Sequence, residues 1–258
     1  MVITDPFVVY LVAAVIGLMV GSFLNVVILR THRAMSFWGG RSKCLQCGHQ
    51  LNWYDNIPLL SFAWLRGKCR HCSTSLSWQY PLVEGVTGIL FALTAHTFGL
   101  TWLTVLSWLV VSLMVAIAVY DGRWSLLPDS FSISLAVAGI GFALSTHTVP
   151  IIDLGIGIVG GAVFFGLQFI ISRGQWVGSG DIFLGGALGA LLGWRMLGVA
   201  LLVAYFSGAI VAAILLLTRR QSKKSALAFG PYLMLGGFIA WMYGEELVTW
   251  YMRTLSWY

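Results

Sequence analysis

The sequence predicts an all-α polytopic membrane protein with about eight transmembrane helices and a small zinc-binding cytoplasmic loop module. The 258 residues are 59% hydrophobic and only 9% charged, whereas about 25% of the residues in a soluble domain are charged. The apolar residues also form runs near the length of about 20 residues that crosses a bilayer as a helix. These runs lie at residues 7–29, 82–98, 102–120, 131–145, 151–171, 182–194, 196–217 and 229–243.

The chain is expected to have three parts. Residues 1–29 form the first transmembrane helix, and residues 82–258 form a transmembrane core. Between them, residues 30–81 are the only long polar segment and contain all four cysteines, so we expect a small module there. The first helix is expected to be retained, because an acid, Asp5, stands where a signal peptide has basic residues.

The basic residues predict the orientation in the membrane. If the amino terminus lies outside and the chain crosses eight times, every Lys and Arg except Arg195 and Arg253 faces the cytoplasm. Cytoplasmic loops of membrane proteins carry such an excess of basic residues. Topology therefore explains the net charge of +6, and we expect a lipid bilayer, and no nucleic acid, as a partner.

Two aspartates lie where apolar runs meet the cytoplasmic side. Asp121 follows the run at 102–120, and Asp181 precedes the run at 182–194. A carboxylate at membrane depth costs roughly 2.5–3.5 kcal/mol, so it usually has a function. Each alone is equally consistent with a solvated acid at a helix end, but two on one side favour a functional pair. Two carboxyl groups that share one proton have the chemistry of an aspartyl protease.

Chain-breaking residues flank both aspartates. Pro128 is expected to interrupt the helix after Asp121, because proline cannot continue a helix. Gly178 lies three residues before Asp181, and Gly180 lies directly before it. Glycine permits positive φ and leaves the backbone accessible, so an extended substrate could approach at this point.

Asp129 is a competing carboxylate, eight residues after Asp121. Eight helical residues span about 12 Å, which is too far for two carboxyl groups to share a proton. We therefore expect Asp129 to cap the helix that follows. Which member of the Asp121–Asp181 pair is the base is left open, because a coupled pair titrates as a unit.

The four cysteines form two Cys-x-x-Cys pairs, separated by residues 48–68. Four thiolates in this pattern match a closed tetrahedral zinc site, so we expect structural zinc. Two disulfides or a redox pair are alternatives, but the expected cytoplasmic side is reducing. His49 and His71 are possible replacement ligands, although four thiolates already complete the set. The expected metal ligands are Cys44, Cys47, Cys69 and Cys72.

An ordered set of motifs extends over nearly the whole chain. The two Cys-x-x-Cys pairs and Gly178-Ser179-Gly180-Asp181 belong to this set. The other motifs are Gly21-Ser22-Phe23-Leu24-Asn25-Val26-Val27, Asn56-Ile57-Pro58-Leu59, Tyr80-Pro81-Leu82-Val83-Glu84, Asp121 with Leu127-Pro128-Asp129, and Phe229-Gly230-Pro231-Tyr232. Together these motifs resemble the bacterial type IV prepilin leader peptidase/N-methyltransferase family.

The resemblance implies a GxGD-type aspartyl protease on an eight-helix membrane scaffold. It assigns catalysis to Asp121 and Asp181 and the zinc to the four cysteines. Enzymes of this family remove the leader peptide of type IV prepilins or of type II secretion pseudopilins, on the cytoplasmic side of the bacterial inner membrane. Many then methylate the new amino terminus with S-adenosylmethionine, and the module at 30–81 is associated with that second step.

Two residues depart from the family pattern. Phe183 stands where the family commonly has lysine, and Gln79 stands where arginine often precedes Tyr80. A nearby ammonium favours an ionised carboxylate, so Phe183 changes the charge environment expected around Asp181. Retention of methyl transfer, the methyl-donor site, the particular prepilin or secretion system and the oligomeric state are left open.

Two other functions are consistent with the sequence. Buried acids and glycine-interrupted helices also occur in proton-coupled transporters. Such transporters often have inverted repeats, but the loop at 30–81 has no counterpart in the second half of the chain. The other alternative is an inactive membrane scaffold whose zinc loop docks secretion components.

Overall fold

The computed structural model of the chain describes residues 5–36, 39–40, 42–218 and 228–255. All regular elements of these residues are helices, apart from two isolated β-bridges in the cysteine-containing loop. Six of the helices are long and apolar enough to cross a membrane. The predicted class, an all-α polytopic membrane protein, is therefore confirmed. Five basic residues that were predicted to face the cytoplasm lie outside the described residues: Arg41, Arg219, Arg220, Lys223 and Lys224.

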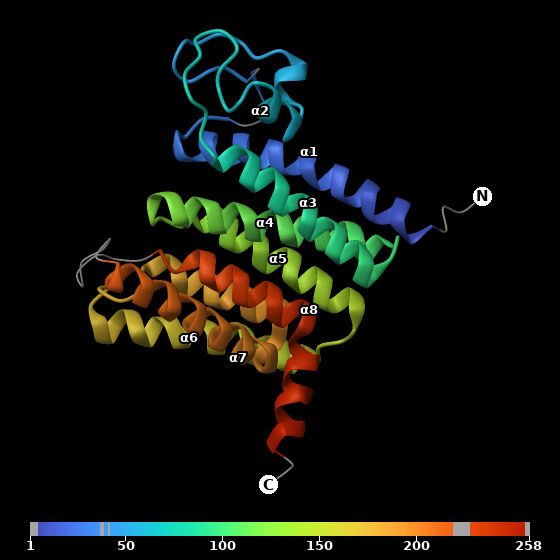
Figure 1. The fold of residues 1–258 in the computed structure, drawn as a ribbon. Helices are drawn as coiled ribbons and strands as arrows, with labels where there is room; N and C mark the ends of the chain where they lie inside the picture. The colour runs from blue at the N-terminus through green and yellow to red at the C-terminus, as the bar shows by residue number, and fades with distance from the viewer. Residues whose placement is uncertain (1–4, 37–38, 41, 219–227, 256–258) are drawn as a thin grey trace. The chain divides into compact units, whose positions relative to one another are not determined.

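The chain forms two compact units, Met1–Ala116 and Ile117–Tyr258, and the boundary falls within α4 (Trp102–Trp124). In the first unit, α1 (Pro6–His32) and α3 (Gln79–Phe98) lie side by side (Figure 1). The cysteine-containing loop connects these two helices, so their packing determines where the loop begins and ends.

Glycines bring the backbones of α1 and α3 into close contact. A Cβ added at Gly17 would lie 2.7 Å from the carbonyl oxygen of Thr87, and one at Gly21 would lie 2.8 Å from the Cα of Glu84. Only residues without a side chain leave room for membrane helices to approach this closely. The glycines of α1 therefore fix where α3 packs.

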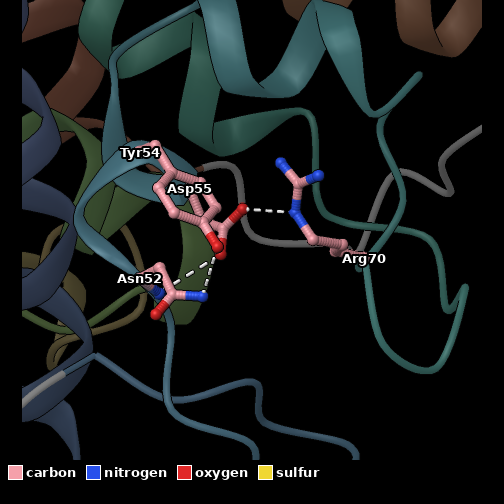
Figure 2. Close-up of polar contacts among 4 residues, drawn as sticks. All are labelled: Asn52, Tyr54, Asp55 and Arg70. Carbon is pink, nitrogen blue, oxygen red and sulfur yellow. Dashed lines mark hydrogen bonds and ion pairs between the residues drawn. The ribbon is translucent and has the colours of Figure 1, made fainter.

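The loop between α1 and α3 contains two short elements, η1 (Trp53–Asn56) and α2 (Leu60–Trp64). Figure 2 shows the polar contacts that hold η1 in place. Asp55 accepts hydrogen bonds from Arg70 Nε at 2.8 Å and from the backbone N–H of Asn52 at 3.2 Å. Asp55 thereby links the turn that follows the first cysteine pair to the second cysteine pair.

Buried polar side chains tie this loop to α3 and tie the start of α3 to α1. Glu84 of α3 accepts the backbone N–H of Leu59 at 2.8 Å. Asn25 of α1 donates to the carbonyl of Tyr80 at 3.3 Å and accepts from Gln79 Nε2 at 3.1 Å. Because buried polar groups are destabilising unless they are hydrogen-bonded, these contacts explain how Asn25 and Glu84 are accommodated in apolar helices.

In the second unit, α7 (Ser179–Leu217) contacts α5 (Asp129–Thr146), α6 (Ile151–Ser172) and α8 (Gly230–Leu255). It is therefore the central element of this unit, and Figure 1 shows α6, α7 and α8 running alongside one another. Glycines of α6 and α7 pack against each other's backbone. The glycine-rich runs of the sequence thus serve close helix packing.

The helix α7 is broken at Gly193, where φ is 67° and ψ is 175°. Glycine is the one residue that adopts these angles readily. The 39 residues of α7 would make about 58 Å of continuous helix, roughly twice the hydrocarbon thickness. The predicted spans 182–194 and 196–217 are the two arms of this broken element. The predicted span 229–243 corresponds to the first part of α8, which is not among the six candidate spans of the described residues.

Candidate active site

Asp121 lies in the last turn of α4 and is only 6% exposed. Its Oδ2 accepts a hydrogen bond at 2.7 Å from the backbone N–H of Gly230, the first residue of α8. The first N–H groups of a helix have no partner within that helix. The preceding residue, Phe229, carries no side-chain acceptor, and Pro231 has no N–H to satisfy. Asp121 of α4 therefore caps α8 from another helix.

Asp181 lies in the first turn of α7 and is 7% exposed. Its Oδ2 accepts a hydrogen bond at 2.9 Å from the backbone N–H of Gly178, the N-cap residue. A carboxylate at the third helical position commonly reaches back to the N-cap N–H in this way. Asp181 therefore caps its own helix.

Asp121 and Asp181 both lie at buried helix ends of the second unit, near enough for the charge of Asp121 to act on the carboxyl group of Asp181. Each accepts one backbone N–H at a helix N-terminus, where partial positive charge stabilises an anion. Among the described residues, no other hydrogen bond reaches either carboxyl group. Each group therefore keeps acceptor capacity for a water molecule or a substrate, which general acid–base catalysis requires.

The two glycines before Asp181 do not use the positive φ that glycine permits. Gly178 has a φ of −80°, and Gly180 is not among the glycines with positive φ. A Cβ at Gly180 would lie 2.7 Å from the Cβ of Leu127, in the connection between α4 and α5. Gly180 therefore allows the start of α7 to pack against the segment that follows Asp121.

Asp129 begins α5, as expected, but it does not cap that helix. The N-cap is Pro128, and no side-chain hydrogen bond caps α5. The predicted capping role of Asp129 is therefore wrong. The helix begins directly after Pro128, whose ring fixes its φ angle. Asp129 is exposed, in contrast to Asp121 and Asp181.

Gly230 is the residue of this site whose role the sequence did not reveal. It belongs to the motif Phe229-Gly230-Pro231-Tyr232, but a glycine offers no side chain whose chemistry can be recognised. Its contribution is a backbone N–H, and its partner Asp121 is 109 residues away. Only the tertiary structure could place these two groups together.

The two departures from the family pattern have different surroundings. Phe183 is 51% exposed on the first arm of α7. Gln79 is the first residue of α3 and donates to the side chain of buried Asn25. Gln79 thus helps to join the start of α3 to α1.

The four cysteines form a compact cluster in the first unit. Their sulfur atoms all lie within 4.8 Å of one another, and Cys44 Sγ is 3.8 Å from Cys72 Sγ. Tetrahedral zinc with Zn–S bonds of about 2.3 Å places its sulfur ligands about 3.8 Å apart. All four cysteines are free thiols. The donor set and its spacing therefore fit a metal ion of the zinc type.

Both cysteine pairs adopt the same local turn. The backbone N–H of the first cysteine, Cys44 or Cys69, donates to the carbonyl five residues later at 2.9 Å in both turns. An isolated antiparallel bridge closes each turn. The residue four positions after the first cysteine has positive φ, 70° at Gly48 and 57° at Ser73. The two halves of the cluster are thus built alike.

Hydrogen bonds and neighbouring thiols give Cys47 and Cys72 different pKa values. Hydrogen bonds with the side chain and backbone of Thr74 lower the pKa of the Cys72 thiol to about 6. A backbone hydrogen bond with His49 lowers the pKa of Cys47, but desolvation and the adjacent thiols raise it more strongly. The net result is a pKa of about 11. Because clustered thiolates repel one another, a divalent cation bound among them would offset two of the four negative charges and hold the thiolates together.

His49 and His71 lie against each other beside the cluster. Their rings stack with centroids 4.2 Å apart and an interplanar angle of 23°. Both residues are exposed, and neither belongs to the group of possible metal ligands found among the described residues. The structure therefore brings together the four cysteines, and not the histidines, as a ligand set.

Known proteins of one family are similar to this chain over nearly its whole length. The bacterial peptidase A24 N-terminal domain matches residues 15–98, and the type IV leader peptidase family matches residues 108–213. A prepilin leader peptidase/N-methyltransferase of Aeromonas salmonicida (strain A449) is 34% identical over 97% of this chain and 96% of its own. A protein of the same name from Myxococcus xanthus (strain DK1622) is 40% identical over 79% of this chain and 62% of its own length. Another, from Legionella pneumophila, is 30% identical over 98% of this chain and 97% of its own length. No solved structure matches the chain significantly.

Proposed function

This chain belongs to the type IV leader peptidase family and is a membrane peptidase, and we propose that Asp121 and Asp181 are its catalytic pair. One observation supports this assignment: each of the two buried carboxyl groups accepts a single N–H at a helix start and retains acceptor capacity beyond that hydrogen bond. The family match favours a peptidase over the transporter and the scaffold that the sequence alone left open.

The proposed reaction divides acid and base work between the two carboxyl groups. The ionised member takes a proton from a water molecule, and the resulting hydroxide attacks the scissile carbonyl carbon. The protonated member donates to the carbonyl oxygen, and a proton is later delivered to the amide nitrogen as the C–N bond breaks. Two neighbouring carboxyl groups do not both ionise readily, so their proximity creates this division. Gly178 lies close to Asp181 and is exposed, so its backbone without a side chain would give an extended substrate access, whereas Gly180 packs against Leu127.

The proposed substrates are type IV prepilins or pseudopilins, from which the enzyme removes the leader peptide. S-adenosylmethionine-dependent methylation of the new amino terminus is the proposed second activity. Both assignments are supported by the relatives, whose names combine prepilin leader peptidase with N-methyltransferase.

Zinc is the proposed metal, bound by Cys44, Cys47, Cys69 and Cys72. Four thiols within 4.8 Å match the ligand number and softness that structural zinc prefers. The metal would replace a hydrophobic core in a loop whose two helical elements have four and five residues. Because all four ligand positions are protein thiolates, the ion would stabilise the loop and would have no open position for a water molecule.

The proposed location is the bacterial inner membrane, with the aspartates and the cysteine loop on the cytoplasmic side. The distribution of Lys and Arg supports this orientation. In the proposed division of the chain, residues 1–29 form the first transmembrane helix, residues 30–81 a cytoplasmic zinc module associated with methyl transfer, and residues 82–258 the peptidase core.

Single Asp121→Asn and Asp181→Asn variants test the catalytic pair. Asparagine keeps a side-chain oxygen that can accept the N–H of Gly230 or Gly178, so both variants should fold. Each should lose leader removal by at least about 1,000-fold, and the double variant should be little worse, because residues that act as a unit are not additive. Co-expression with a prepilin and separation of precursor from product on a gel measures this.

Asp129→Asn is the matched control, because Asp129 is an exposed acid at a nearby helix start. Its processing rate should equal that of the wild-type chain. If either paired variant folds and still processes at the wild-type rate, the catalytic assignment is wrong. Mass spectrometry of the mature pilin reports the cleavage site, and a 14 Da increase at the amino terminus, roughly one methyl group, reports methylation.

A further inference from the structure

Among the residues that the structure describes, Gly230 makes the one long-range hydrogen bond to the proposed catalytic pair. Its backbone N–H donates to Asp121 Oδ2 at 2.7 Å in a buried setting. Asp181 differs, because its own hydrogen bond comes from Gly178, three residues away in the same helix start. The orientation of Asp181 is therefore fixed locally, whereas that of Asp121 depends on how α8 packs against α4.

The space around Gly230 requires glycine. A Cβ added there would lie 2.7 Å from Oδ2 of Asp121, 2.9 Å from its Cβ and 3.0 Å from its Cγ. Real Cβ atoms essentially never approach other atoms within 3.0 Å. Any side chain at this position would therefore displace the Asp121 carboxyl group or lift the start of α8 away from α4.

The same helix contact contains a second glycine that faces a different neighbour. A Cβ at Gly122 would lie 3.3 Å from Cγ of Pro231, a tight but adjustable distance. Gly122 and Pro231 are the chain neighbours of Asp121 and Gly230. The two glycines therefore differ in their neighbours: Gly230 faces the carboxyl group of Asp121, whereas Gly122 faces the ring of Pro231.

We propose that Gly230 is a positioning residue of the peptidase: its N–H holds the Asp121 carboxyl group in its working orientation, and its missing side chain makes that contact possible. This inference rests on the proposed catalytic role of Asp121. Gly230 touches neither substrate nor water in this role and acts through Asp121. The start of α8 thereby becomes part of the active-site architecture, although it contributes no reactive side chain.

Gly230→Ala is the direct test in a purified, detergent-solubilised chain with a prepilin substrate. The misplaced carboxyl group should lower kcat by about 100-fold, because small displacements of a catalytic group have effects of this size. KM should change by less than about twofold, since uniform binding of the substrate is not altered. Gly198→Ala should retain wild-type kcat, because a Cβ at exposed Gly198 would have no neighbour within 4 Å.

A thermal stability cycle tests the contact without using activity. Gly230→Ala should lower the apparent Tm of the wild-type chain by about 4 °C, as expected for overpacking a close contact. In an Asp121→Ala background, which removes Cγ and both oxygens, the same substitution should lower Tm by less than half as much. In an Asp121→Asn background the full decrease should return, because the side chain again occupies the space.

Gly122→Ala is the control for packing at the same helix contact. Its Tm change should be the same in the wild-type and Asp121→Ala backgrounds, since its neighbour is Pro231. If Asp121→Ala fails to fold, Asp121→Ser replaces it in the cycle, because serine also lacks the Oδ2 atom.

Two results would overturn the proposal: an equal Tm decrease for Gly230→Ala in both backgrounds, or a loss of processing that arises from KM alone. A wild-type chain that leaves prepilins uncut would instead refute the proposed function. In that case a coupled Tm cycle would still support the contact between Gly230 and Asp121.

Discussion

The cysteine cluster and the aspartate pair are both built from two similar halves, but their halves are joined over different chain distances. Each half of the cluster is a closed turn in which Cys44 or Cys69 donates to a carbonyl five residues later. Each half of the aspartate pair is a carboxyl group that accepts one N–H at a helix start. For Asp181 that N–H is local, whereas for Asp121 it is 109 residues away.

The difference teaches how each centre can be disrupted. The cluster depends on four thiol side chains that converge within one loop, so removal of one thiol should open it. The aspartate pair depends on helices that approach closely at glycines, so an added methyl group should disturb it even where no reactive atom is changed. The following expectations test this contrast, from the largest effect to the smallest.

Loss of the metal should have the largest effect on the first unit. In Cys44→Ser the bound zinc should fall from about one per chain to near zero, because structural zinc contributes on the order of 10 kcal/mol to a small module. Elemental analysis and limited proteolysis of the loop between α1 and α3 measure this. His71→Ala should keep its zinc, since the four thiols are the converging ligands. A Cys44→Ser chain that retains metal and resists protease would contradict the proposed zinc site.

Gly180→Ala should disturb the second unit more than Gly178→Ala, although both glycines precede Asp181. At Gly180 the new Cβ would lie 2.7 Å from Leu127 Cβ, which should cost about 3 kcal/mol as overpacking. At Gly178 the closest neighbour would be Asp181 Oδ2 at 3.8 Å, an ordinary contact, so stability should change by less than about 1 kcal/mol. Thermal unfolding in detergent measures both, and equal losses would show that the close approach of Leu127 is not what requires glycine.

Glu84→Ala should loosen the attachment of the cysteine loop to α3. It removes the acceptor of the Leu59 N–H, and an unsatisfied buried donor costs about 2 kcal/mol. Glu84→Gln keeps an oxygen in that position and should cost less than half as much. Protease sensitivity of residues 53–65 and the Tm of the chain report this, and identical behaviour of the two variants would argue against an acceptor role.

Substitutions at Gly48 and Ser73, the two cysteine-turn positions with positive φ, should have the smallest effect on metal retention. A non-glycine residue at positive φ costs roughly 1 kcal/mol, so Gly48→Ser should weaken metal retention slightly. Ser73→Gly relieves the same strain and should leave retention equal or slightly improved. Competition with a chelator measures both. A large loss from Ser73→Gly would show that the two turns are not equivalent.

The sequence by itself determined the fold class and the composition of both centres. Runs of apolar residues predict membrane helices because a helix satisfies its own backbone hydrogen bonds in lipid. The spacing of Cys44 and Cys47, repeated at Cys69 and Cys72, predicts a metal site because both turns are local. The capping contact between Asp181 and Gly178 is equally local, three residues apart.

Only the tertiary structure decided how distant groups meet. Glycine at position 180 is needed for a close contact with Leu127 and not for a left-handed backbone. The two predicted spans 182–194 and 196–217 are arms of one helix that is broken at Gly193. The tertiary structure also placed the N–H of Gly230 on Asp121. Local patterns are readable because neighbouring residues share a fixed geometry, whereas a backbone N–H has the same chemistry at almost every position. Which one reaches a given carboxyl group is decided by the packing of the helices.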